Sequence, residues 1–110
     1  LALGAFKNIA AVTTTNPLAT PQWQARVNEQ RLGGATPQVP VYLYHGLIDE
    51  IIPYDQGTGL RTSWCGRGAR VQWADYWLAD HLLGIFAAQG DVINWMNARF
   101  ANQAFTPTCN

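Results

Sequence analysis

Residues 39–53 read VPVYLYHGLIDEIIP, and this stretch decides the fold. Its first part, near 39–45, is an almost unbroken apolar run rich in valine and tyrosine, which indicates a strand buried on both faces, as parallel strands are. Pro53 suits the first turn of a helix that continues to about Cys65, although two glycines within it weaken helix formation. Alternating apolar and polar residues near 69–77 then indicate a second strand. Strand, helix and strand in this order predict an α/β fold, with a right-handed βαβ crossover and a parallel sheet.

Helices are expected to precede this βαβ unit. Apolar spacing predicts an amphipathic helix over 1–12, and Thr20 followed by a proline predicts the start of a second, mostly polar helix that ends at a glycine pair. No linker or repeat interrupts the chain. We therefore expect a single domain over 1–110, with leading helices over 1–33 and a βαβ-helix unit over 38–110.

The last helix is expected to begin at Asp91, because an aspartate suits the cap position of a helix. The side chains expected to be buried by this helix share helical spacing: Val92, Trp95, Met96 and Phe100. A polar tail then leads to Cys109.

The composition excludes several kinds of partner. The 110 residues are 48% hydrophobic and 13% charged, and seven basic residues balance seven acidic ones. Balanced charge gives no long-range attraction to nucleic acid, so no nucleic-acid partner is expected. No apolar run approaches the roughly 18 residues of a membrane span, so no integral membrane segment is expected. The chain starts at Leu1 without a leader pattern and is interpreted as a processed or excised segment.

Cys65 and Cys109 are the two cysteines of the chain. Their even number suits an oxidising compartment, and a bridge between them would close a loop of about 45 residues, worth about 4 kcal/mol in the chain-entropy model. Two unrelated buried thiols are the alternative. Neither His45 nor His81 forms a ligand-spaced pair with a cysteine. We predict the Cys65–Cys109 disulfide, no metal site and no cofactor.

Two side chains that suit catalysis follow the two predicted strands. Asp49 comes shortly after the first strand and His81 shortly after the second. Functional residues of open α/β sheets lie beyond the carboxyl ends of the strands, and adjacent parallel strands place their following loops side by side. We therefore expect Asp49 and His81 to lie close enough to share a hydrogen bond. An acid followed by a histidine also matches the last two members of the Ser, Asp/Glu, His order of α/β-hydrolases.

Each of these residues also has a structural interpretation. An aspartate ahead of a helix is often a cap, and a single histidine after a strand is often a packing residue. Glu50 and Asp80 are alternative acids, but Asp80 is less favoured because neighbours in sequence seldom point at each other. His45 is expected to support its loop by hydrogen bonding rather than to react.

Short motifs along 28–109 resemble those of a known family. They are His45-Gly46, Asp49-Glu50, Ile52-Pro53-Tyr54, Cys65-Gly66, Gly68-Ala69, His81, Trp95, Arg99-Phe100 and Cys109. With these motifs the chain resembles the end of the secretory, lipase-A-like lipases, which are α/β-hydrolases that act on acylglycerols and other esters. The His-Gly-x-x-Asp pattern by itself also occurs in thioesterases and peptidases of the same fold.

The resemblance implies that the chain is the C-terminal part of an α/β-hydrolase fold, with Asp49 as triad acid and His81 as triad base. It also shows two departures. The family's nucleophile lies in a Gly-x-Ser-x-Gly elbow, and this chain has no such motif, since its one serine is Ser63. Asp80 precedes His81 where a small residue is expected.

The resulting interpretation is a C-terminal segment of a secreted lipase or esterase. It would supply the acid and base for carboxylic ester hydrolysis, lack the nucleophile and be inactive alone. Its partners would be the upstream part of the parent hydrolase and, in the full-length protein, an ester or lipid substrate. The alternative is a non-catalytic, disulfide-stapled secreted module from an inactive lipase, with a binding or structural role, so enzymatic activity stays open.

Overall fold

The computed structural model describes residues 11 and 13–109, and the chain divides into two units, Leu1–Gly34 and Ala35–Asn110. The helix expected over 1–12 lies outside the described residues except for residue 11. The boundary between the units falls at the glycine pair expected to end the leading helices.

The first unit contains the short 3-10 helix η3 (Pro17–Ala19) and the helix α1 (Pro21–Glu29). Asn16 caps η3, because its side chain accepts a hydrogen bond from the Leu18 N–H at 3.0 Å. Pro21 occupies the first turn of α1, where its missing N–H costs nothing. The predicted second helix is therefore present, but it ends at Glu29, four residues before the glycine pair expected to end it.

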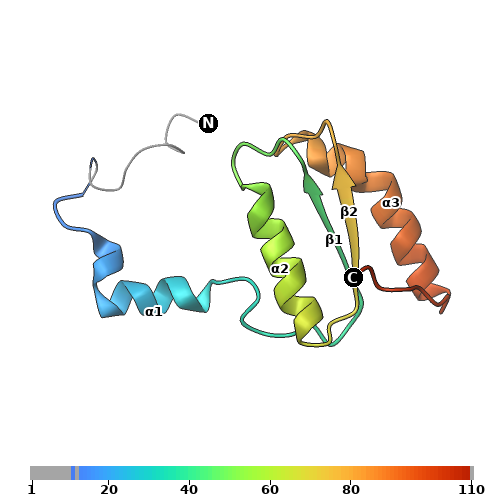
Figure 1. Cartoon of the computed structure of the whole chain (residues 1–110), viewed down its shortest axis with the longest axis horizontal. Helices are drawn as coiled ribbons and strands as arrows, with labels where there is room; N and C mark the ends of the chain where they lie inside the picture. The colour runs from blue at the N-terminus through green and yellow to red at the C-terminus, as the bar shows by residue number, and fades with distance from the viewer. Residues whose placement is uncertain (1–10, 12, 110) are drawn as a thin grey trace. The chain divides into compact units, whose positions relative to one another are not determined.

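The second unit contains the βαβ-helix arrangement. Its elements in chain order are β1 (Val41–Gly46), α2 (Tyr54–Gly66), β2 (Val71–Tyr76) and α3 (Leu83–Phe100). β1 and β2 pair in parallel, with Val41 opposite Val71 and Gly46 opposite Tyr76 (Figure 1). The predicted order of strand, helix and strand is confirmed, and each strand begins two residues later than predicted.

The helices α2 and α3 flank the two strands on opposite sides (Figure 1). On the α2 side, Trp73 is buried, and the Arg61 guanidinium lies 5.7 Å from the centroid of its ring. On the α3 side, the rings of Tyr42 and Trp95 pack with their centroids 5.7 Å apart. A strand that contacts a helix on each face needs apolar side chains on both, which explains the nearly unbroken apolar run of β1.

The helix α3 begins at Leu83, eight residues before Asp91, so the predicted start of the last helix is wrong. Asp80 provides the cap instead, because its Oδ1 accepts hydrogen bonds from the N–H groups of Leu82 and Leu83 at 3.0 and 2.7 Å. Asp91 lies inside the helix and accepts a 2.7 Å hydrogen bond from the Tyr76 hydroxyl of β2. Its carboxylate therefore ties the helix to the sheet rather than capping the helix.

The predicted buried face of the last helix is only half right. Val92 and Trp95 are partly buried, whereas Met96 and Phe100 are 46% and 80% exposed. A sheet of two strands is narrow, so it covers only a narrow stripe of the helix packed on it. Side chains beside that stripe stay in solvent.

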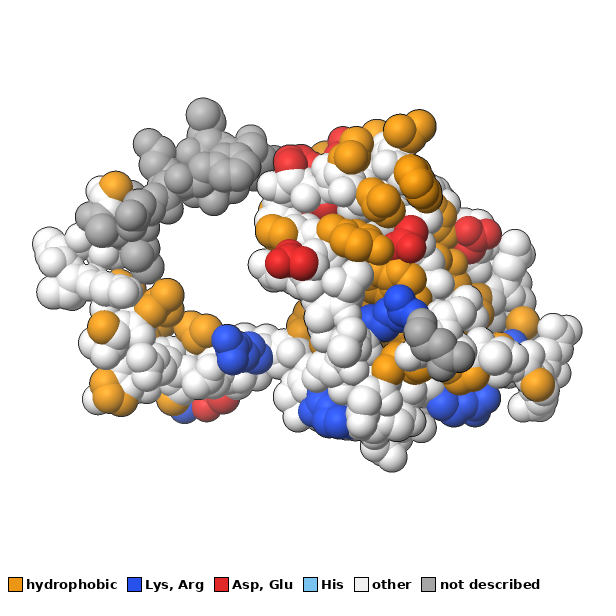
Figure 2. Space-filling model, viewed as in Figure 1, with side chains coloured by type: hydrophobic (Ala, Val, Ile, Leu, Met, Phe, Trp, Pro, Cys, Tyr) orange, Lys and Arg blue, Asp and Glu red, His pale blue; other side chains and the backbone are white. Residues whose placement is uncertain are grey.

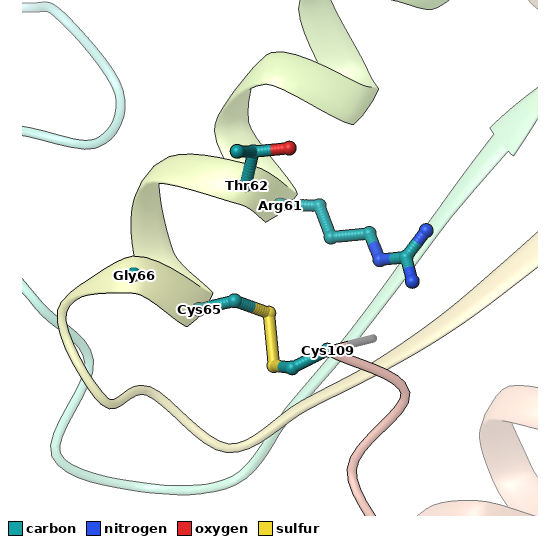
Figure 3. Close-up of a pocket in the computed structure, with 5 residues that line it drawn as sticks. All are labelled: Arg61, Thr62, Cys65, Gly66 and Cys109. Carbon is teal, nitrogen blue, oxygen red and sulfur yellow. A yellow bond between two sulfur atoms is a disulfide. The ribbon is translucent and has the colours of Figure 1, made fainter.

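The predicted disulfide between Cys65 and Cys109 is present and joins the end of α2 to the C-terminal tail (Figure 3). Beside it, the Arg61 guanidinium donates hydrogen bonds to the Thr108 carbonyl oxygen. A covalent bond and a charge-assisted hydrogen bond thus hold the tail against α2.

The tail also covers the edge of β2 that faces away from β1. The Thr108 N–H donates to the Val71 carbonyl at 2.8 Å, and the Thr108 hydroxyl accepts from the Trp73 N–H at 2.6 Å. These bonds satisfy backbone groups that an edge strand would otherwise leave unpaired.

Among residues 11 and 13–109, no helix has the length and apolar character of a membrane span.

Candidate active site

Asp49 lies in the loop after β1, and its own backbone turn holds its carboxylate in place. Its Oδ1 accepts hydrogen bonds from the N–H groups of Ile51 and Ile52, at 2.9 and 2.8 Å. The Asp49 N–H donates to the Gly46 carbonyl at 3.3 Å. An aspartate bonded to the backbone two and three residues ahead fixes both the loop and its own rotamer.

His81 lies in the loop between β2 and α3, and the structure brings it to Asp49. The His81 Nδ1 atom is 3.0 Å from Asp49 Oδ2 and 3.2 Å from Asp49 Oδ1. The His81 side chain is 34% exposed and the Asp49 side chain 9% exposed. A largely buried carboxylate therefore contacts one nitrogen of an imidazole that remains open to solvent.

The surroundings of Asp49 favour its ionised form. Burial raises the pKa of the carboxyl group, but hydrogen bonds from the Ile52 N–H, the His81 ring and the Ile51 N–H outweigh it and hold the pKa of Asp49 below its ordinary value. An ionised carboxylate has no proton to donate, so Asp49 accepts a hydrogen bond from the Nδ1–H of His81. It thereby selects the tautomer of His81 that carries the proton on Nδ1.

The two alternative acids make other contacts. Glu50 Oε2 accepts from the His81 backbone N–H at 3.4 Å rather than from the ring. Asp80 caps α3 through the N–H groups of Leu82 and Leu83. Of the three acids considered, Asp49 is the one whose carboxylate hydrogen-bonds to the His81 ring.

The loops that carry Asp49 and His81 approach each other very closely at Gly46. A Cβ atom added to Gly46 would overlap with the Ala79 carbonyl oxygen. The Ile48 N–H donates to the same carbonyl at 3.3 Å. Gly46 was not predicted as a site residue, although a glycine at the end of a strand is a known signal of close backbone approach.

A pocket of about 240 Å³ lies at the pair, lined among others by Tyr44, Asp49, Ile52, His81 and Ile85. Four apolar side chains within residues 77–86, the segment that carries His81, are largely exposed: Trp77, Leu78, Leu82 and Phe86. Figure 2 shows hydrophobic and acidic side chains gathered at the end of the unit where β1 and β2 finish, which is at the top of the view. Within the part of the chain that the structure describes, no group of three or more His, Cys, Asp or Glu side chains has the arrangement of a metal site.

The fold and site define a mixed α/β unit with a carboxylate and an imidazole paired on adjacent strand-end loops. The profile of the secretory lipase family matches residues 5–107, and the chain belongs to this family. It is 38% identical over 74 residues to Lipase 10 of Candida albicans, a match that covers 66% of this chain and 16% of the relative.

Other relatives are named as secreted enzymes. The chain is 46% identical over 41 residues to the secreted triacylglycerol lipase LIP5 of Malassezia globosa, a match that covers 37% of this chain and 9% of that protein. It is also 46% identical over 41 residues to the secreted triacylglycerol lipase LIP1 of Malassezia furfur, covering 37% and 8%. Each of these matches thus covers less than a fifth of the relative's length.

Proposed function

We propose that this chain is the part of a secreted α/β-hydrolase lipase that supplies the acid and base of a Ser-Asp-His triad. The observation that carries the proposal is the contact of 3.0 Å between His81 Nδ1 and Asp49 Oδ2. Membership of the secretory lipase family supports carboxylic ester hydrolysis as the reaction. The names of the Malassezia relatives support an extracellular location and an acylglycerol substrate.

The chemistry follows from the paired side chains. Asp49 holds His81 with its proton on Nδ1, which leaves the Nε2 lone pair free to take the proton of a serine hydroxyl as its oxygen attacks the ester carbonyl. Asp49 then stabilises the imidazolium. His81 returns the proton to the departing alcohol, and the acyl group stays on the serine until a water molecule, deprotonated in the same way, releases the acid.

The nucleophile is proposed to lie in the part of the parent protein beyond this chain. Ser63, the one serine present, lies in α2, where its hydroxyl accepts a 3.2 Å hydrogen bond from Arg67. The exposed apolar side chains of the segment that carries His81, Trp77 and Leu82 among them, suit contact with the apolar part of an ester or with the rest of the enzyme.

An activity comparison tests the proposal. The 110-residue chain and the longer parent protein are assayed on short-chain and long-chain esters under the same conditions. The chain alone should hydrolyse neither, because it has no nucleophile for the acyl-enzyme, whereas the parent should hydrolyse at least one. A folded parent that is inactive on both would contradict the proposal and favour the binding or structural alternative.

A further inference from the structure

His45, in β1, carries a largely buried imidazole that the proposed triad chemistry does not use. Its side chain is 10% exposed. The Trp73 ring stacks on it at a centroid distance of 6.5 Å and an interplanar angle of 20°, and the Tyr54 ring meets it edge-on at 5.7 Å and 85°. Two aromatic rings therefore restrict the imidazole on two sides.

The helix α2 restricts the ring on a third side. A Cβ atom added to Gly57, which is buried in α2, would overlap with His45 Nδ1. A glycine inside a helix costs about 1 kcal/mol relative to alanine. Glycine is nevertheless required at position 57, because only a residue without a side chain leaves room for the His45 imidazole.

Asp75 holds the two aromatic rings in place. Its Oδ1 accepts hydrogen bonds from the Tyr54 hydroxyl and from Trp73 Nε1, each at 2.7 Å. The bond to Asp75, with a contribution from burial, raises the pKa of Tyr54, so this phenol remains a donor at neutral pH. Asp75 is also the residue paired with His45 across the parallel sheet.

The remaining edge of the imidazole faces the loop that carries Asp49. His45 Nε2 is 2.9 Å from the Ile52 carbonyl oxygen, a distance at which Nε2–H donates to it, and 3.6 Å from Asp49 Oδ2. The Ile52 N–H in turn donates to Asp49 Oδ1. Residue Ile52 is therefore held through its carbonyl by His45 and through its N–H by Asp49.

We propose that His45 is a positioning residue for Asp49. Trp73, Tyr54 and Gly57 hold its imidazole in place. The Nε2–H of His45 fixes the Ile52 carbonyl by a hydrogen bond and lies beside Asp49 Oδ2. The Asp49 carboxylate is thereby kept pointing at His81 Nδ1. The inference rests on the proposed roles of Asp49 and His81. It adds that the sheet, through Asp75 and its two aromatic partners, sets the geometry of the acid.

Two substitutions separate positioning from packing. His45→Phe keeps a flat ring but removes the donor to Ile52, whereas His45→Gln places an amide N–H the same number of bonds from Cβ as Nε2. In the longer parent protein, His45→Phe should lower kcat about 10- to 100-fold, as expected for a catalytic group misplaced by a fraction of an ångström to one ångström, with KM changed less than about twofold. His45→Gln should retain most of kcat.

The second readout is the Nδ1–H proton resonance of His81, observed by NMR in the 110-residue chain. The hydrogen bond to Asp49 shifts this signal downfield, and the signal should broaden or disappear in His45→Phe and persist in His45→Gln. Equal kcat and equal His81 signals in His45→Phe and wild type would overturn the proposal. Should His45→Phe fail to fold, His45→Asn, whose amide is too short to reach Ile52, is expected to show the same losses.

The two readouts also separate this inference from the proposed function. An inactive parent protein would contradict the triad, yet the His81 signal would still report whether His45 positions Asp49. An active parent in which His45→Phe behaves as wild type would contradict only the role of His45.

Discussion

Gly46 and the Ala79 carbonyl lie so close together that no side chain fits between them. The contact joins the end of β1 to the loop after β2, and these are the segments that lead to Asp49 and His81. The 3.0 Å contact of the acid and the imidazole therefore depends on a backbone approach that only glycine permits.

Gly46→Ala should push the two loops apart. We expect it to destabilise the chain by about 1 to 3 kcal/mol, as overpacking does, and to weaken the Asp49–His81 contact. Urea denaturation measures the first effect and the His81 Nδ1–H resonance the second. Gly59→Ala is the matched control, because nothing lies within 4 Å of its added Cβ, and it should stabilise the helix α2 by up to about 1 kcal/mol. Equal stability of the two variants would show that the loops are not tightly packed.

The Cys65–Cys109 disulfide should contribute substantially to stability. It closes a sequence separation of 44 residues, and disulfides of this kind typically contribute about 2 to 4 kcal/mol. The double variant Cys65→Ser with Cys109→Ser should lose that amount in urea denaturation, and the Thr108 amide should lose its protection from hydrogen exchange. A double variant as stable as wild type would show that the Arg61 and Thr108 contacts hold the tail without the bond.

The ionisation of Asp49 makes stability depend on pH. Since its folded-state pKa lies below the ordinary value of 3.8, its contribution is complete above that value and is lost as the pH falls through the folded-state pKa. Asp49→Asn should therefore be less stable than wild type at neutral pH, and the difference should shrink below about pH 4. Urea midpoints measured between neutral and acid pH check this. A difference that does not change with pH would mean that the carboxylate carries no such linkage.

The sequence predicted the βαβ order and the pairing of Asp49 with His81, because both follow from local patterns and from the rule that adjacent strand ends carry adjacent loops. It failed at Asp91, because an aspartate suits the cap position and was therefore expected to begin the last helix. The partner of Asp91 is Tyr76, which lies on another element. A cap and a tertiary hydrogen bond use the same residue type, so local pattern does not separate them.

The packing around the site could not be predicted from the sequence either. Taken alone, Gly46 weakens a strand and Gly57 weakens a helix. The structure shows why glycine is needed at both positions: the Ala79 carbonyl lies against Gly46, and His45 Nδ1 lies against Gly57. His45 was expected to support its loop, but its partners Trp73 and Ile52 come from different parts of the fold. Such contacts depend on three-dimensional distance, which spacing along the chain does not give.

The central claim is that Asp49 and His81 act as acid and base in the parent enzyme. The most direct test is kcat/KM for a short-chain ester, measured in the longer protein with four variants: His81→Ala, Asp49→Asn, Glu50→Gln and Asp80→Asn. The first two should lower kcat/KM by roughly 10⁴-fold, as the loss of a triad member does, and the last two by less than about tenfold, since asparagine still caps a helix. A folded His81→Ala enzyme that keeps kcat/KM within tenfold of wild type would contradict the account.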